Sequence, residues 1–125
     1  MTFDIPADML LLFVMRMDEQ MIDSMLSDKE TYMSMKRKEF LEFISRRFSY
    51  HKLSCGDTAL LALRGTYQGG TMEGYSFLGN KSRQRLDLIV AVNEKNEIIH
   101  LTSSPDFAFH SVGFAKYFLP ENTKS

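Results

Sequence analysis

Residues 83–103, RQRLDLIVAVNEKNEIIHLTS, hold the pattern that decides the fold. Apolar and other side chains alternate through Arg83–Val92, which is typical of a β-strand whose two faces differ. The polar segment Asn93-Glu94-Lys95-Asn96 then separates this run from a second one, Glu97–Ser103, and together they predict a β-hairpin. One face of the first strand holds Leu86, Leu88, Val90 and Val92, and the other holds Arg85, Asp87, Ile89 and Ala91.

Two further strands precede this hairpin and extend it into an antiparallel meander. Thr58–Tyr67 has apolar side chains on both faces, and Met72–Leu78 follows it as the next strand. The segment between them, Gln68-Gly69-Gly70-Thr71, has the composition of a loop or hairpin turn. Upstream, Cys55-Gly56-Asp57 predicts a turn, and Tyr50–Leu53 before it predicts a short extended segment.

The first 48 residues have helical periodicity instead. Asp4 is placed to cap a helix whose first turn contains Pro6. Apolar residues then follow at helical spacing, at Leu10, Phe13, Val14, Met17 and Met21. Asp18 lies within this stripe. The helix therefore either runs on to Met25 or stops early, with Asp18 capping a second helix over Glu19–Leu26.

A third helix is expected after a break at Ser27-Asp28-Lys29. Alternation over residues 31–35 indicates a short extended piece before it, and Ser34 is the expected cap. The buried face of this helix combines Phe40, Leu41, Ile44 and Phe48.

Helices first and an antiparallel meander second indicate an α+β fold, with the N-terminal helices packed on the concave face of a curved sheet. The opposite face of the sheet still carries Ile89 and Ala91. A second apolar face on an open sheet usually meets another sheet or another subunit, so the pattern predicts a homodimer through the convex face. Residues 107–118 fit a short helix and an extended arm equally.

Composition narrows the class of protein. A chain of 125 residues is expected to form a single domain, residues 1–125. Its net charge of −1 gives no broad basic field for nucleic acid or an anionic membrane. The longest apolar run, Met9–Met15, is far shorter than the roughly 20 residues of a membrane span. A single cysteine, Cys55, excludes an internal disulfide and a multi-cysteine metal site. We therefore expect a soluble, cytoplasmic protein.

Four stretches carry a further pattern: Asp18–Leu26, Lys36–Ile44, Leu63–Gly69 and Leu88–Ile99, with Pro105-Asp106 after the last of them. They are similar to a helix that opens with an aspartate, a helix of the form K-E-E-F-L, a strand with spaced glycines, and a closing hairpin followed by an aspartate. In this order they resemble the nuclear-transport-factor-2-like superfamily, which includes SnoaL-like cyclases and ketosteroid isomerase. The resemblance covers about residues 5–106.

The resemblance implies a cone-shaped sheet, an apolar pocket between the helices and the sheet, and dimers that pair through the convex face. The pocket residues that it implies are Phe13, Met17, Phe40, Ile44, Tyr67, Tyr75, Leu86, Leu88 and Val90. Steroid isomerase chemistry is not expected, because its base, acid and tyrosine would fall near Met33-Ser34, Leu88 and Leu10, which cannot do that work.

A SnoaL-like acid–base pair would come from His100 and Asp106, which the fold leads to the mouth of the cone. The simpler alternative puts His100 on a strand face toward solvent or a partner, and Asp106 in a turn. We assign His51 and His110 to the surface and interpret Cys55 as a spectator thiol with no obvious base beside it. The spacing of the histidines does not fit a metal site on one element.

Two functional hypotheses follow. The first is a small-molecule-binding domain with an apolar pocket, without a cofactor or metal. The second is a SnoaL-like cyclase, isomerase or hydrolase that moves a proton next to the carbonyl of a small apolar compound. A protein-interaction module that uses the convex sheet face is a third alternative.

Overall fold

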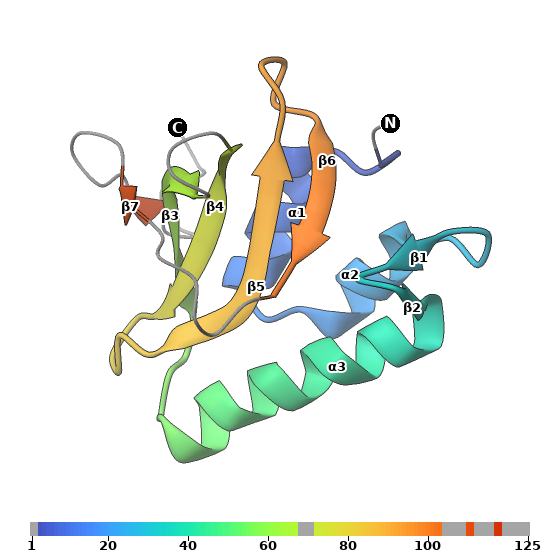
Figure 1. Cartoon of the computed structure of the whole chain (residues 1–125). Helices are drawn as coiled ribbons and strands as arrows, with labels where there is room; N and C mark the ends of the chain where they lie inside the picture. Colours follow the sequence, from blue (N-terminus) through green and yellow to red (C-terminus); the bar gives the residue numbers. More distant parts are fainter. Residues whose placement is uncertain (1–2, 68–71, 104–109, 112–116, 119–125) are drawn as a thin grey trace.

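The computed structural model describes residues 3–67, 72–103, 110–111 and 117–118, and the fold is α+β (Figure 1). The helices are α1 (Ala7–Met15), α2 (Glu19–Met25) and α3 (Arg37–Ser49), and α3 continues into one π-helical turn, η1 (Tyr50–Ser54). The strands are β1 (Thr31–Tyr32), β2 (Met35–Lys36), β3 (Leu60–Tyr67), β4 (Met72–Gly79), β5 (Arg85–Val92), β6 (Ile98–Thr102), β7 (His110–Ser111) and β8 (Tyr117–Phe118). The predicted strands of the meander are confirmed to within two or three residues at their ends.

The helix starts follow local chemistry, and two of them differ from the sequence prediction. Asp18 caps α2, because its carboxylate accepts a hydrogen bond from the N–H of Met21 at 3.2 Å, so the two-helix alternative is confirmed. The predicted Asp4 cap is wrong, since α1 begins directly after Pro6 without a side-chain cap. The predicted Ser34 cap is also wrong. Met33 and Ser34 have positive φ and form the turn of the β1–β2 hairpin, so α3 begins later, at Arg37.

The main sheet has the strand order β6-β5-β4-β3-β7, and β8 also pairs with β3. All of these pairs are antiparallel. Gly74 lies opposite Ala91, where β4 and β5 approach so closely that a Cβ at position 74 would lie 2.5 Å from the carbonyl oxygen of Val90. Glycine is therefore required at this point of the sheet.

The core lies between the helices and one face of this sheet. Leu86, Leu88, Val90 and Val92 of β5 all belong to it, as the alternation predicted, and α3 contributes Phe40, Ile44 and Phe48. Figure 1 shows α1 behind β5 and β6, and α3 running past the lower ends of the strands. The helices thus cover one side of the sheet.

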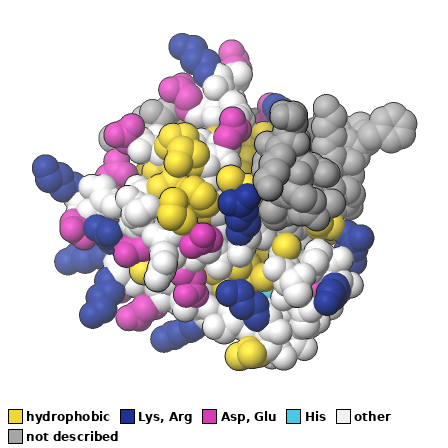
Figure 2. All heavy atoms as spheres, turned by 180° about the vertical axis from the view of Figure 1, so that it is seen from behind, with side chains coloured by type: hydrophobic (Ala, Val, Ile, Leu, Met, Phe, Trp, Pro, Cys, Tyr) yellow, Lys and Arg dark blue, Asp and Glu magenta, His cyan; other side chains and the backbone are white. Residues whose placement is uncertain are grey.

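The other face of β5 is also covered. Ile89 and Ala91 are fully buried within the single chain. The predicted dimer rested on these two residues being exposed, so it stays a prediction without that support. Figure 2 shows the molecule from behind, where acidic and basic side chains surround a patch of hydrophobic ones. Large hydrophobic side chains that stay exposed in the described part of the chain include Met9, Met21, Tyr50 and Leu53.

The longest helix of the structure, α3, has 13 residues. Within the described ranges, no helix has both the length and the apolar character that a membrane crossing requires.

Candidate functional site

The candidate site is built by the turn that follows α3. The sequence predicted an extended segment over Tyr50–Leu53, but these residues continue the helix as the π-helical turn η1. The N–H of Cys55 donates to the carbonyl oxygen of Tyr50 at 3.1 Å, which closes an i→i+5 turn. The chain then turns through Gly56, whose φ of 74° suits glycine, and Asp57 N–H bonds back to the His51 carbonyl at 2.7 Å. These hydrogen bonds bring four residues close together: Tyr50, His51, Cys55 and Asp57.

His51 and Asp57 form a buried pair at the centre of this turn. Nδ1 of His51 lies 2.7 Å from Oδ2 of Asp57, and the two side chains are 1% and 0% exposed. The sequence assignment of His51 to the surface is therefore wrong. The extended segment assumed there gave no reason for burial, whereas the π turn directs this side chain inward.

Asp57 also receives hydrogen bonds from the turn between β4 and β5. The backbone N–H groups of Lys81 and Ser82 donate to its Oδ1 at 3.0 and 2.8 Å, and the Ser82 hydroxyl donates to its Oδ2 at 2.7 Å. Burial alone raises the pKa of Asp57, but the hydrogen bonds from His51, Ser82 and Lys81 outweigh it and lower the pKa to about 2. The carboxylate is thus ionised at neutral pH and ties η1 to the β4–β5 turn.

Gly79 at the end of β4 makes room for this carboxylate. A Cβ at position 79 would lie 1.9 Å from Oδ2 of Asp57 and 2.6 Å from Oδ1. Any side chain at this position would displace the carboxylate and break its hydrogen bonds. Glycine at the end of β4 is therefore part of the site.

The ionised Asp57 fixes the tautomer of His51. A carboxylate only accepts hydrogen bonds, so the proton of the neutral imidazole is on Nδ1 and the lone pair is on Nε2. That Nε2 atom is buried and has no hydrogen-bond partner among the described residues. Nε2 is therefore the atom through which the neutral imidazole can act as a base.

Cys55 is the neighbouring group with a proton to give. Its Sγ, a ring nitrogen of His51 and a carboxylate oxygen of Asp57 all lie within 4.8 Å of one another. Cys55 is a partly exposed residue and so lies between the buried pair and the surface. The Tyr50 ring meets the His51 ring edge-on at 5.7 Å, and interaction with the Cys55 side chain raises the pKa of the Tyr50 phenol. The interpretation of Cys55 as a thiol with no base beside it is therefore wrong.

The same three side chains are poorly suited to a metal ion. In the described part of the chain they are the one group of three with metal-binding side chains in reach of one another. Both oxygens of Asp57 are, however, occupied by hydrogen bonds from His51, Lys81 and Ser82. Only Nε2 of His51 and Sγ of Cys55 would remain as ligands, whereas a zinc site uses three or four protein ligands.

The structure does not bring the predicted catalytic pair together. His100 is exposed on β6, where it lies opposite Ala91. Asp106 and the side chain of His110 lie outside the described residues. The pairing of His100 with Asp106 stays a prediction.

The predicted pocket residues lie in the core. Buried there are Phe13, Met17, Phe40, Ile44, Tyr75, Leu86, Leu88 and Val90. The side chain of Tyr67 lies outside the described part. None of these residues lines either of two hollows found among the described residues, one of about 470 Å³ at the β5–β6 hairpin and one of about 270 Å³ on α3.

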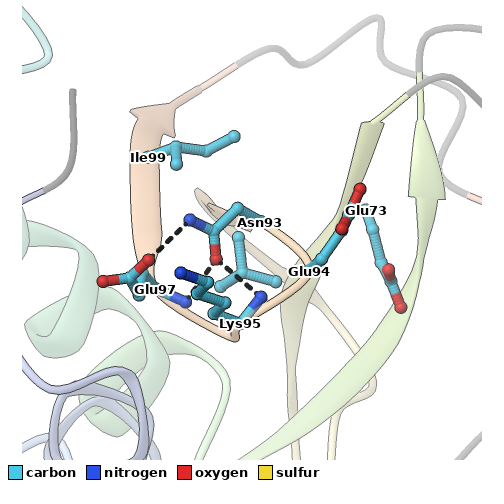
Figure 3. A pocket seen from close by; sticks show the side chains of 7 residues that line it. Glu73, Asn93, Glu94, Lys95, Glu97 and Ile99 are labelled. Carbon is cyan, nitrogen blue, oxygen red and sulfur yellow. Dashed lines mark hydrogen bonds between the residues drawn. The ribbon is translucent and has the colours of Figure 1, made fainter.

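The hollow at the hairpin is polar and lies at the surface (Figure 3). Asn93 Oδ1 accepts the N–H groups of Lys95 and Glu97, both at 2.9 Å, and its amide donates to the Glu97 carboxylate at 2.9 Å. Glu73 and Glu94 also line it. Its lining suits a cationic group better than an apolar one.

The chain was compared with known proteins. Comparison with models of protein families, with curated protein sequences and with solved structures finds no match to the chain. The resemblance to the nuclear-transport-factor-2-like superfamily therefore stays a prediction, and the function must be argued from the site.

Proposed function

We propose that this chain performs nucleophilic chemistry with the thiol of Cys55, using His51 as the base and Asp57 to orient His51. The observation that carries the proposal is the buried Nε2 of His51, which lacks a partner in the described structure while Nδ1 is held by Asp57. Sγ of Cys55 lies in the same cluster but is not hydrogen-bonded to Nε2 in this structure, so the two atoms must first approach each other. Nε2 then accepts the thiol proton as Sγ attacks an electrophilic atom, and the ionised Asp57 stabilises the imidazolium that forms.

Burial decides which of these groups meets the substrate. His51 is 1% exposed, so a substrate outside the protein does not reach its ring directly. Cys55 is partly exposed and lies in the same cluster. Chemistry driven by the His51–Asp57 pair therefore passes through the sulfur atom, which favours a nucleophilic thiol over direct proton transfer to a bound carbonyl compound.

Alkylation of the native chain by iodoacetamide at pH 7 tests the proposal. We expect Cys55 to react at least about ten-fold faster than the same thiol in the chain unfolded in urea, because a positioned base contributes at least this factor. A native rate equal to or below the unfolded rate would contradict the proposal.

The variant Asp57→Asn separates the chemistry from the fold. An amide at position 57 can still accept from Lys81 and Ser82, but its NH₂ group donates to Nδ1 of His51 and so puts the ring proton on Nε2. We expect the alkylation rate to fall to that of the unfolded chain while the variant stays folded. Asp23→Asn, which changes an exposed carboxylate, is the matched control and should keep the wild-type rate.

A second candidate function is the binding of a small molecule, in keeping with the nuclear-transport-factor-2-like resemblance. Two helices, a short hairpin, a third helix and an antiparallel meander support that resemblance by their order. In this proposal the sheet is cone-shaped, its concave face carries the helices, and the convex face pairs two copies. An increase in thermal midpoint with a small apolar ketone would support an apolar pocket, and its absence across a panel of such compounds would contradict it.

The polar hollow favours a different ligand for this second function. Glu73, Glu94 and Glu97 line it with one lysine, Lys95, and because Arg64 pairs with Glu73 the negative charge is that of Glu94 and Glu97. We expect a small diamine to bind there in preference to the ketone. Glu97→Gln should weaken that binding in a calorimetric titration, whereas Glu19→Gln on α2 should not.

A further inference from the structure

The hydroxyl of Tyr50 is placed to act beside the thiol. Residues five apart align along a π-helical turn, and the bond from Cys55 N–H to the Tyr50 carbonyl oxygen fixes these two residues next to each other. Interaction with the Cys55 side chain, through hydrogen bonding and the charge of a thiolate, raises the pKa of the Tyr50 phenol, so the phenol keeps its proton at neutral pH. Tyr50 is therefore a proton donor next to the sulfur atom.

The backbone of the turn does not suit acyl transfer. A tetrahedral acyl intermediate needs hydrogen-bond donors, typically two backbone N–H groups, aimed at its oxyanion. Of the three N–H groups over residues 55–57, that of Cys55 already bonds to Tyr50 and that of Asp57 bonds to His51. At most the N–H of Gly56 stays free. The turn thus offers one amide and one phenol, and no pair of amides.

The surface around Cys55 is partly open. Cys55 itself is partly exposed, Tyr50 is 51% exposed, and a Cβ added to Gly56 would meet no atom beyond its chain neighbours within 4 Å. A substrate that needs only a nucleophilic sulfur and one proton donor fits this arrangement. Hydroperoxides have this requirement, because cleavage of the O–O bond leaves an alkoxide or hydroxide that must be protonated.

We propose that the electrophile attacked by Cys55 is a hydroperoxide and that Tyr50 protonates the oxygen that leaves. This inference rests on the proposed nucleophilic function of Cys55. His51 takes the thiol proton, Sγ bonds to the terminal oxygen of ROOH, and the O–O electron pair leaves with RO⁻, which takes the proton of Tyr50. The imidazolium of His51 returns a proton to the Tyr50 phenolate. The balance is Cys–SH + ROOH → Cys–SOH + ROH, with sulfur oxidised and the peroxide reduced.

The sulfenic acid must be reduced by another molecule. The chain contains one cysteine, so no second thiol of the same chain can resolve it. A low-molecular-weight or protein thiol would form a mixed disulfide with release of water, and a second thiol would then regenerate Cys55.

The experiment compares two electrophiles on the same thiol. Reduced wild-type chain is mixed with hydrogen peroxide or cumene hydroperoxide at pH 7, and sulfenic acid is trapped with dimedone and followed by intact mass. Iodoacetamide serves as the second electrophile, because iodide leaves without needing a proton. We expect both reactions to be at least about ten-fold faster than in the urea-unfolded chain.

Tyr50→Phe then identifies the proton donor. We expect this variant to lose about ten-fold or more in the hydroperoxide rate and to keep the iodoacetamide rate within about two-fold. Tyr75→Phe is the matched control, because the Tyr75 hydroxyl bonds to Asn96 instead, and it should leave both rates unchanged.

The outcomes separate the two proposals. Fast alkylation with slow peroxide oxidation overturns the hydroperoxide assignment and leaves the nucleophilic function standing. Slow reaction with both electrophiles overturns both. Equal loss of both rates in Tyr50→Phe, or loss of neither, overturns the assigned role of Tyr50 and with it this inference.

Discussion

At the N-terminal end of α3, Arg37 bonds to Asp23 at 3.0 Å through side chains that are 31% and 43% exposed, whereas beyond its other end His51 and Asp57 meet at 2.7 Å through side chains that are 1% and 0% exposed. Both contacts join a nitrogen atom to a carboxylate oxygen at similar distances. They differ in solvent exposure, and burial determines how much each contributes to the free energy of unfolding.

Removing one partner of the Arg37–Asp23 pair costs little, since water can hydrate the partner that remains. The buried pair has no such substitute, and each partner depends on the other for its hydrogen bonds. The difference also explains why the buried pair carries chemistry. The base is held in one tautomer beside a thiol, and its accepting atom is buried without a partner among the described residues.

The largest effect is expected from removing the buried carboxylate. Asp57→Ala leaves His51, Lys81 and Ser82 without their acceptor, so the free energy of unfolding should fall by about 3–5 kcal/mol. Urea denaturation measures it. A loss smaller than that of a typical surface substitution would show that the turn holds together without the pair, and that burial does not separate the two ends of α3.

Gly79→Ala should have the next largest effect. The added methyl group overlaps the Asp57 carboxylate, so we expect a loss of about 2–3 kcal/mol in the free energy of unfolding. Gly56→Ala is the matched control. Its φ of 74° makes a side chain there cost only about 1 kcal/mol, because the space around it is open. Equal losses in the two variants would contradict the role of Gly79.

Acid should weaken the buried end of α3 over a defined range of pH. Hydrogen bonding lowers the pKa of Asp57 from 3.8 to about 2, so the folded chain binds this proton less readily than the unfolded chain does. The stability that Asp57 contributes is therefore fully present above about pH 4 and is lost as the pH falls toward 2. The thermal midpoint of wild type should fall more steeply over this range than that of Asp57→Asn. Parallel curves would contradict it.

The smallest effect is expected at the exposed end. Arg37→Gln removes the ion pairs with Asp23 and Asp28 and the hydrogen bond to the Asp23 carbonyl oxygen, yet the free energy of unfolding should fall by less than about 1 kcal/mol, because solvent screens this partly exposed pair. Added salt should change the denaturation midpoints of wild type and Arg37→Gln by the same amount. A clear loss of stability would remove the contrast between the two ends.

The sequence was sufficient for the elements whose side chains repeat. The alternation in Arg85–Val92 predicted which side chains face the helices, and a cap at Asp18 was one of the two alternatives left open for the start of α2. The sequence did not predict burial of the second face of β5, because period-two alternation does not indicate what covers Ile89 and Ala91.

The site could not be predicted because it depends on one local conformation. Residues four apart, such as His51 and Cys55, are about 13 Å from each other in an extended chain but are neighbours in a helical turn. An extended assignment for Tyr50–Leu53 therefore separated the base from the thiol. Apolar residues at helical spacing end at Phe48, so the sequence gave no indication that α3 continues for another turn.

The fit of Gly79 around Asp57 has a consequence for how this sequence can drift. A methyl group at one position and an acid at the other cannot coexist without rearrangement, although the two lie in different elements of the chain. Substitutions there are therefore tied across generations. A side chain at 79 displaces the acid at 57, so descendants that gain one also lose the orientation of His51 beside the sulfur.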